Sequence, residues 1–149
     1  MIQLMTSGKK SNKDIKTYSV SSEIQSLEVK INAADFTIIG KPIPTSKPFT
    51  RIDGSVYKFN DKTIDRYAGY STGLAILFET DSPIIKARWT TGGGNSGANM
   101  AAIGQKGLDL YIMKGGKWVF AGVGSPDMKK APFSKHEGTI VTDMTEDAK

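Results

Sequence analysis

Short runs of alternating apolar and polar residues, ending at turn-forming residues, constrain the fold more than any other feature. In residues 74–79, Leu74, Ile76 and Phe78 alternate with Ala75, Leu77 and Glu79. In residues 84–89, Ile85, Ala87 and Trp89 alternate with Ile84, Lys86 and Arg88. The segment between them, 79–83 (ETDSP), suits a turn. A period of two is typical of a strand with one buried face. The pattern therefore predicts an antiparallel hairpin over residues 74–89.

A second hairpin is predicted over residues 108–121. Residues 108–113 alternate, and residues 118–121 form a second apolar run. Between them, Gly115 and Gly116 occupy the centre of a turn, where both residues must adopt positive φ and glycine does so without strain.

Other segments are predicted from the same signals. Brief strands are expected at residues 26–31, 56–59 and 139–142. Residues 61–70 are expected to form a polar loop, and residues 90–104 are too rich in glycine for a stable helix.

The overall content of turn formers agrees with many short strands. The chain has 16 glycines and six prolines, which helix interiors disfavour. Three of the prolines fall in residues 40–54, which are expected to run extended over the surface. The prediction is an all-β fold: an antiparallel, jelly-roll-like β-sandwich of about seven strands, without a helix.

The N-terminal residues differ from the rest in composition. Residues 1–22 are polar and lack periodicity, so they are expected to form a leader or linker, with one β-sandwich domain over residues 23–149. The net charge is +5, and four lysines fall within residues 1–16. A nucleic-acid-binding face gathers its basic residues among aromatic ones, so no nucleic-acid partner is predicted. No apolar run is long enough for a membrane span, and no intact signal peptide is visible.

No segment has the pattern of a catalytic, metal or cofactor site. Residues 92–97 are glycine-rich, but a phosphate-binding loop needs a strand before it and a helix after it. The single histidine, His136, lies in a polar stretch and is expected to be a solvated loop residue. The chain has no cysteine, and one histidine without cysteine makes a transition-metal site improbable. No cofactor is predicted.

Two kinds of residue are candidates for other roles. Asp109 interrupts an apolar strand, and we expect its carboxylate to tie a neighbouring loop to that strand. Three aromatic residues, Tyr67, Tyr70 and Trp89, are candidates for glycan contact by stacking, although an aromatic residue on a strand is more often part of the core.

Several segments together resemble a known family. The stretch 104–111 (GQKGLDLY), followed by 115–118 (GGKW) and 122–124 (GVG), is similar to the GxDLY domain at the N-terminus of SGNH (GDSL-like) hydrolases, a module of exported Bacteroidetes esterases. Further matches run from residue 35 to residue 89, and the resemblance covers about residues 28–143. The motif residues are Gly104, Gly107, Asp109, Leu110 and Tyr111.

The resemblance implies a β-sandwich that precedes an α/β catalytic domain, and a periplasmic or extracellular location. The family's catalytic domain carries a Gly-Asp-Ser nucleophile block and an Asp-x-x-His block, and this sequence has neither. Residues 53–55 hold the same residue types in another order, and His136 has no aspartate three positions before it. Because family members continue into another apolar strand, the sandwich is expected to be truncated at its C-terminus.

Three functions follow as hypotheses. The first is a non-catalytic accessory domain, with the SGNH catalytic domain of the same polypeptide as its partner, that helps to shape a cleft for a carbohydrate ester. The second is a free-standing carbohydrate-binding module, and the third is a complete small enzyme, which the missing nucleophile block disfavours. A cluster of Tyr67, Tyr70 and Trp89 on the surface would favour the second over the first.

Overall fold

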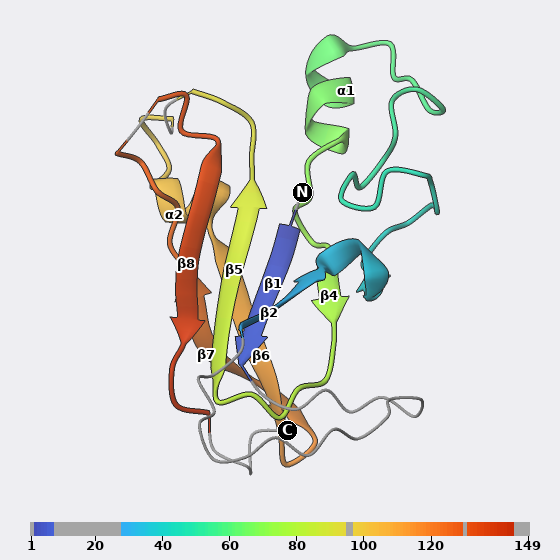
Figure 1. The fold of residues 1–149 in the computed structure, drawn as a ribbon. Coiled ribbons are helices and arrows are strands. Elements are labelled where there is room, and N and C mark those ends of the chain that lie inside the picture. The colour runs from blue at the N-terminus through green and yellow to red at the C-terminus, as the bar shows by residue number, and fades with distance from the viewer. Residues whose placement is uncertain (1, 8–27, 95–96, 130, 145–149) are drawn as a thin grey trace. The chain divides into compact units, whose positions relative to one another are not determined.

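The computed structural model describes residues 2–7, 28–94, 97–129 and 131–144, and within them strands predominate (Figure 1). The strands are β1 (Ile2–Ser7), β2 (Glu28–Asn32), β3 (Thr37–Ile39), β4 (Ala75–Leu77), β5 (Ile84–Thr90), β6 (Leu108–Lys114), β7 (Lys117–Gly124) and β8 (Lys135–Val141). Two short helices, α1 (Lys62–Ala68) and α2 (Ala102–Lys106), and a 3-10 turn η1 (Ala33–Asp35) complete the described elements. The all-β, antiparallel fold class is confirmed.

The chain forms two compact units. Unit 1 comprises residues 1–31 and 79–149, and unit 2 comprises residues 32–78. The prediction of a leader over residues 1–22 and one β-sandwich domain over residues 23–149 stays a prediction.

Unit 1 contains a four-stranded sheet and a two-stranded hairpin. The sheet has the order β2-β1-β5-β8, and β5 pairs antiparallel with β1 on one side and with β8 on the other. The hairpin β6–β7 packs against the sheet through β7 and β8. Gly122 marks the close contact, because a Cβ at this position would clash with the carbonyl oxygen of Ile140 on β8.

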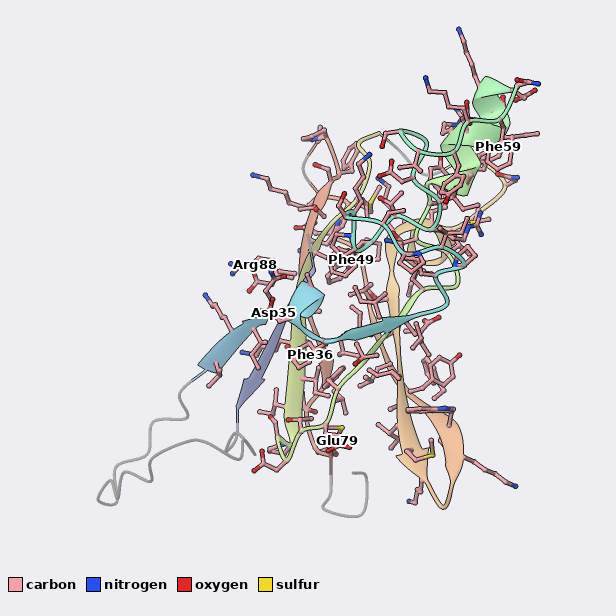
Figure 2. All side chains as sticks on the ribbon, turned by 90° about the vertical axis from the view of Figure 1, so that its right-hand side faces the viewer. Asp35, Phe36, Phe49, Phe59, Glu79 and Arg88 are labelled. Atoms are coloured by element: carbon pink, nitrogen blue, oxygen red, sulfur yellow. The ribbon has the colours of Figure 1, made fainter. Side chains whose placement is uncertain are left out.

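The core of unit 1 follows from the alternation in β5. Ile85, Ala87 and Trp89 are buried, whereas Arg88 between them is exposed. Arg88 pairs with Glu137 on β8 at 2.8 Å, and Figure 2 shows its side chain on the side of β5 turned away from the hairpin. The period of two seen in the sequence thus separates a buried face from a solvated one.

Unit 2 is built around the short antiparallel pair β3–β4. Gly40, just after β3, has a φ of +82°, and a Cβ there would clash with the carbonyl oxygen of Gly73. Phe36, between η1 and β3 (Figure 2), packs its ring 5.6 Å from that of Phe78. A glycine and an aromatic pair therefore allow two very short strands to lie close together.

Three expectations about strands and loops are wrong. The segments around 74–79 and 84–89 do not form one hairpin, because β4 pairs with β3 in unit 2 while β5 pairs with β1 and β8 in unit 1. Residues 56–59 contain a turn and irregular backbone rather than a strand. The segment 61–70, expected as a loop, contains α1.

Asp61 caps the N-terminus of helix α1 and stabilises its first turn. Asp61 accepts hydrogen bonds from the backbone N–H groups of Thr63 and Ile64, at 2.7 and 3.1 Å. These bonds favour the ionised carboxylate and hold the pKa of Asp61 below its usual value. An aspartate N-cap satisfies donors that a helix start leaves unpaired, and this signal was present in the sequence.

The expected leader is also corrected in part. Residues 2–7 form strand β1, paired with β5, instead of an irregular segment. The rest of the expected leader, residues 8–22, lies outside the described residues. The glycine-rich segment 90–104 ends in α2, whose five residues begin only at Ala102. No helix among the described residues is long and apolar enough to span a membrane.

Candidate interaction site

The predicted hairpin over residues 108–121 is present as β6–β7. Gly115 and Gly116 at the centre of its turn have φ values of +57° and +75°, and these positive values confirm the turn predicted from the sequence. The pairing runs from Leu108 opposite Gly124 to Lys114 opposite Lys117, with an irregularity after Leu110. Because that extra residue lies on β7, the alternation along β6 is unbroken.

The two faces of this hairpin differ in exposure. On the inner face Leu110 is buried, whereas Val119, nearer the turn, is 43% exposed. On the outer face, Tyr111, Trp118 and Phe120 are 51%, 58% and 56% exposed. Tyr111 lies opposite Phe120, and their rings meet edge to face with centroids 5.8 Å apart. We call Asp109, Tyr111, Trp118 and Phe120 the outer face of the hairpin.

The motif residues divide between structural and exposed positions. At Gly107 a Cβ would clash with the carbonyl oxygen of Ile103, so close packing explains this glycine, whereas Gly104 has only ordinary contacts. Asp109 is exposed, and within the part of the chain described here no hydrogen bond ties its carboxylate to a loop. The expected structural role of Asp109 is therefore not found.

Segments before and after the hairpin together form a buried polar cluster. The indole Nε1 of Trp89 donates to the carbonyl oxygen of Lys106 at 2.6 Å. The ammonium of Lys106, itself buried, donates to the carbonyl oxygens of Gly92 and Phe133, at 2.6 and 2.9 Å. Phe133 has a φ of +58°, which is unfavourable for an aromatic residue, and the bond from Lys106 helps to hold it.

His136 belongs to the same cluster and is not a solvated loop residue. It lies on β8, is 2% exposed, and packs its ring 5.3 Å from that of Trp89. Its Nδ1 lies 3.2 Å from the carbonyl oxygen of Asp127 and its Nε2 lies 2.9 Å from the hydroxyl of Thr91. A carbonyl only accepts, so Nδ1 carries the proton and Nε2 of the neutral ring accepts from Thr91.

The electrostatics of His136 agree with a neutral ring. Burial lowers its pKa below the usual value, and the nearby charge of Lys106 lowers it further. The hydrogen bond to Asp127 acts in the opposite direction but does not outweigh burial. His136 thus fixes a loop to the sheet and is not a base open to solvent.

The three glycan candidates do not form one surface cluster. Trp89 is 2% exposed, so its indole cannot stack on a sugar, and this candidate is wrong. Tyr67 and Tyr70 are each 50% exposed in unit 2, with ring centroids 5.5 Å apart and edge to face. The guanidinium of Arg66 lies 4.9 Å from the ring centre of Tyr67.

The Asp-Gly-Ser segment of unit 2 has a structural arrangement. The carboxylate of Asp53 accepts from the ammonium of Lys47, and from the backbone N–H and the hydroxyl of Ser55, at 2.7, 2.9 and 2.7 Å. These bonds, that from Lys47 foremost, lower the pKa of Asp53 to about 2. The hydroxyl of Ser55 is thus bonded to an anion that is a very weak base, which does not activate it as a nucleophile.

The described residues bring together no group of three His, Cys, Asp or Glu side chains that could hold a metal ion. The candidate site is instead the exposed aromatic surface on hairpin β6–β7. The fold defines the class as a small antiparallel β domain, and this surface is its candidate site.

Comparison with known proteins identifies the family. A family model described as GxDLY, the N-terminus of SGNH-hydrolase-type esterases, matches residues 29–149. The chain therefore belongs to the GxDLY family, the N-terminal domain of SGNH-type esterases.

A solved structure agrees with this assignment. The crystal structure of a proposed GDSL-like lipase from Bacteroides ovatus is 37% identical and has a TM-score of 0.69. The match covers 76% of this chain and 32% of that one, so the chain spans about a third of the length of its neighbour. The comparison with curated proteins gave no match.

The sequence contains a signal for the outer face of the hairpin. A two-residue turn at Gly115 and Gly116 fixes the register, and that register places Phe120 opposite Tyr111. The buried cluster of Trp89, Lys106 and His136 had no such signal, because its members come from separate segments that only the fold brings together.

Proposed function

We propose that this chain is the non-catalytic accessory domain of an SGNH-type esterase, packing on the catalytic domain and shaping a cleft for a carbohydrate ester. Within the family, the location expected for the parent protein is periplasmic or extracellular. The observation that carries the proposal is the state of the chain's one histidine.

A serine hydrolase needs a histidine that reaches both its nucleophile and the substrate. His136 is enclosed by unit 1, its Nε2 is bonded to Thr91, and burial lowers its pKa. The hydroxyl nearest to a carboxylate in unit 2, that of Ser55, has Asp53 as its partner. With the family's catalytic blocks missing from the sequence, ester hydrolysis is expected to depend on a separate domain.

The test compares two proteins on an activated acetyl ester. We expect residues 1–149 to hydrolyse it no faster than a matched protein blank, and the full-length product of the gene to hydrolyse it with turnover. Turnover by residues 1–149 that is abolished by Ser55→Ala would contradict the proposal. A full-length product that lacks a Gly-Asp-Ser block and has no esterase activity would contradict it as well.

A free-standing carbohydrate-binding module is the second candidate, and Tyr67 and Tyr70 favour it. Both are half exposed, as a sugar-stacking pair requires. Their edge-to-face geometry presents no common flat platform, which makes this the weaker candidate. Retarded migration of residues 1–149 in a polysaccharide gel, lost in Tyr67→Ala but not in Tyr111→Ala, would favour it over the accessory role.

A further inference from the structure

Three of the four residues on the outer face of the hairpin are aromatic. Trp118 and Phe120 alternate on β7, and Tyr111 lies directly opposite Phe120 on β6. Each of the three is more than half exposed. The register places all three on the face of the hairpin opposite to that of the buried Leu110.

The apolar area of this surface can be estimated from its three aromatic side chains. An aromatic side chain carries about 150–250 Å² of surface, so three of them at half exposure present on the order of 300 Å². The largest apolar patch of a soluble monomer is about this size and is often functional. Aromatic residues, tryptophan and tyrosine above all, are also the residues that dominate binding energy at interfaces.

The motif of the family points to the same surface. Within Gly-x-Asp-Leu-Tyr, the packing of unit 1 explains Gly107, which has no room for a side chain, and Leu110, which is buried. The same packing does not explain Asp109 and Tyr111, because both point outward. Half of the motif thus lies on the outer face of the hairpin and is not buried in the packing of unit 1.

The course of the chain at the end of β8 bears on which surface could contact a following domain. Strand β8 runs toward the end of unit 1 where the turn of β6–β7 lies (Figure 1). After β8 the chain is held by a bond from the N–H of Met144 to the carbonyl oxygen of Pro83. In this family the domain stands at the N-terminus, and the match covers 32% of the solved neighbour, so a larger segment follows in that protein.

From this juxtaposition we infer that the outer face of hairpin β6–β7 is the surface on which the catalytic domain of the same polypeptide docks. The inference rests on the proposed function and adds to it the residues of the contact. Tyr111, Trp118 and Phe120 form its apolar centre, and Asp109 supplies a carboxylate at its edge for a donor on the catalytic domain.

The test uses cysteine labelling, which the sequence favours because the chain has no cysteine of its own. Phe120→Cys is prepared in residues 1–149 and in the full-length product, and Trp118→Cys is a second probe in case the first disturbs folding. Tyr67→Cys is the matched control, since Tyr67 is about equally exposed but lies in unit 2. Alkylation rates with N-ethylmaleimide are followed by peptide mass spectrometry.

We expect cysteine at position 120 or 118 to react at least about tenfold more slowly in the full-length product than in residues 1–149. The cysteine at position 67 should react at the same rate in both. Equal rates at the hairpin positions in an active full-length esterase would overturn the inference and leave the proposed function standing. Equal protection at all three positions would overturn it too, because the contact would not be selective.

Two further outcomes would contradict the inference. Slow labelling of the hairpin in residues 1–149 that becomes fast on dilution would mean that a second copy covers the face, and the inference would be wrong. A full-length product without a catalytic domain would overturn both the inference and the proposed function.

Discussion

The two tryptophans of the chain make a matched pair for testing the packing argument. Trp89 is 2% exposed and its Nε1 donates to the carbonyl oxygen of Lys106, whereas Trp118 is 58% exposed. Changing each to phenylalanine removes the same atoms from two different environments. The free energy of unfolding should therefore fall for Trp89→Phe and remain nearly constant for Trp118→Phe.

The expected cost at Trp89 has two parts. The smaller ring buries about 50 Å² less apolar surface, which costs about 1 kcal/mol at 25 cal/mol per Å². Loss of the indole N–H removes the donor to the carbonyl of Lys106, and an unpaired buried acceptor costs about 1–3 kcal/mol. The sum is about 2–4 kcal/mol for Trp89→Phe, against less than about 0.5 kcal/mol for Trp118→Phe.

The measurement is urea unfolding followed by far-UV circular dichroism, because fluorescence changes when a tryptophan is removed. In thermal unfolding, the same difference corresponds to about 5–15 °C for a chain of this size. Equal midpoints for the two variants, or a loss below about 1 kcal/mol at Trp89, would refute the assignment of Trp89 to the core and of Trp118 to the surface.

Three other outcomes are expected. Burial lowers the pKa of His136 in the folded state, so the unfolded chain binds a proton at a higher pH than the folded chain does. The free energy of unfolding is therefore highest well above pH 6.5 and falls as the pH drops from there toward the folded-state pKa. The slope is at most about 1.4 kcal/mol per pH unit for one proton. Urea midpoints from pH 8 to 5 check this, and the slope should persist unchanged in Asp109→Asn but disappear in His136→Gln. Asp109→Ala should change the stability of residues 1–149 by less than about 0.5 kcal/mol, since the carboxylate is exposed; a loss of 1–3 kcal/mol would restore the structural role. Gly116→Ala should cost about 1 kcal/mol, because the residue has φ +75°, whereas Gly92→Ala, at a glycine without positive φ and with free space for a Cβ, should cost clearly less.

Local patterns predicted the fold class and the hairpin β6–β7, because alternation and turn chemistry are properties of adjacent residues. They failed for residues 74–89, where two good strand patterns flank a good turn. Each strand has a better partner elsewhere: β4 in β3 and β5 in β1 and β8. These partner strands lie far away in the sequence, and the strand propensity of a segment does not say which other strand it will pair with.

The candidate site shows the same division. The outer face of the hairpin follows from a register that Gly115 and Gly116 set locally. Burial of His136 does not, since its polar neighbours in sequence suggest solvent while Trp89, Thr91 and Lys106 enclose it in space. A polar segment can pass through a buried position when other segments supply its hydrogen bonds.

The pairing of β1 with β5 also sets the order in which the domain can form. Ile2 lies opposite Trp89, so β1 leaves the ribosome well before its partner has been made. The thermodynamic penalty is small, because each doubling of the closed loop costs only about 0.6 kcal/mol. The kinetic consequence is larger, since pairing at long sequence separation slows folding. Unit 2 is continuous and can form its contacts in the meantime. Until β5 appears, β1 can pair only with the short strand β2, and its other edge is open to pairing with another nascent chain during synthesis.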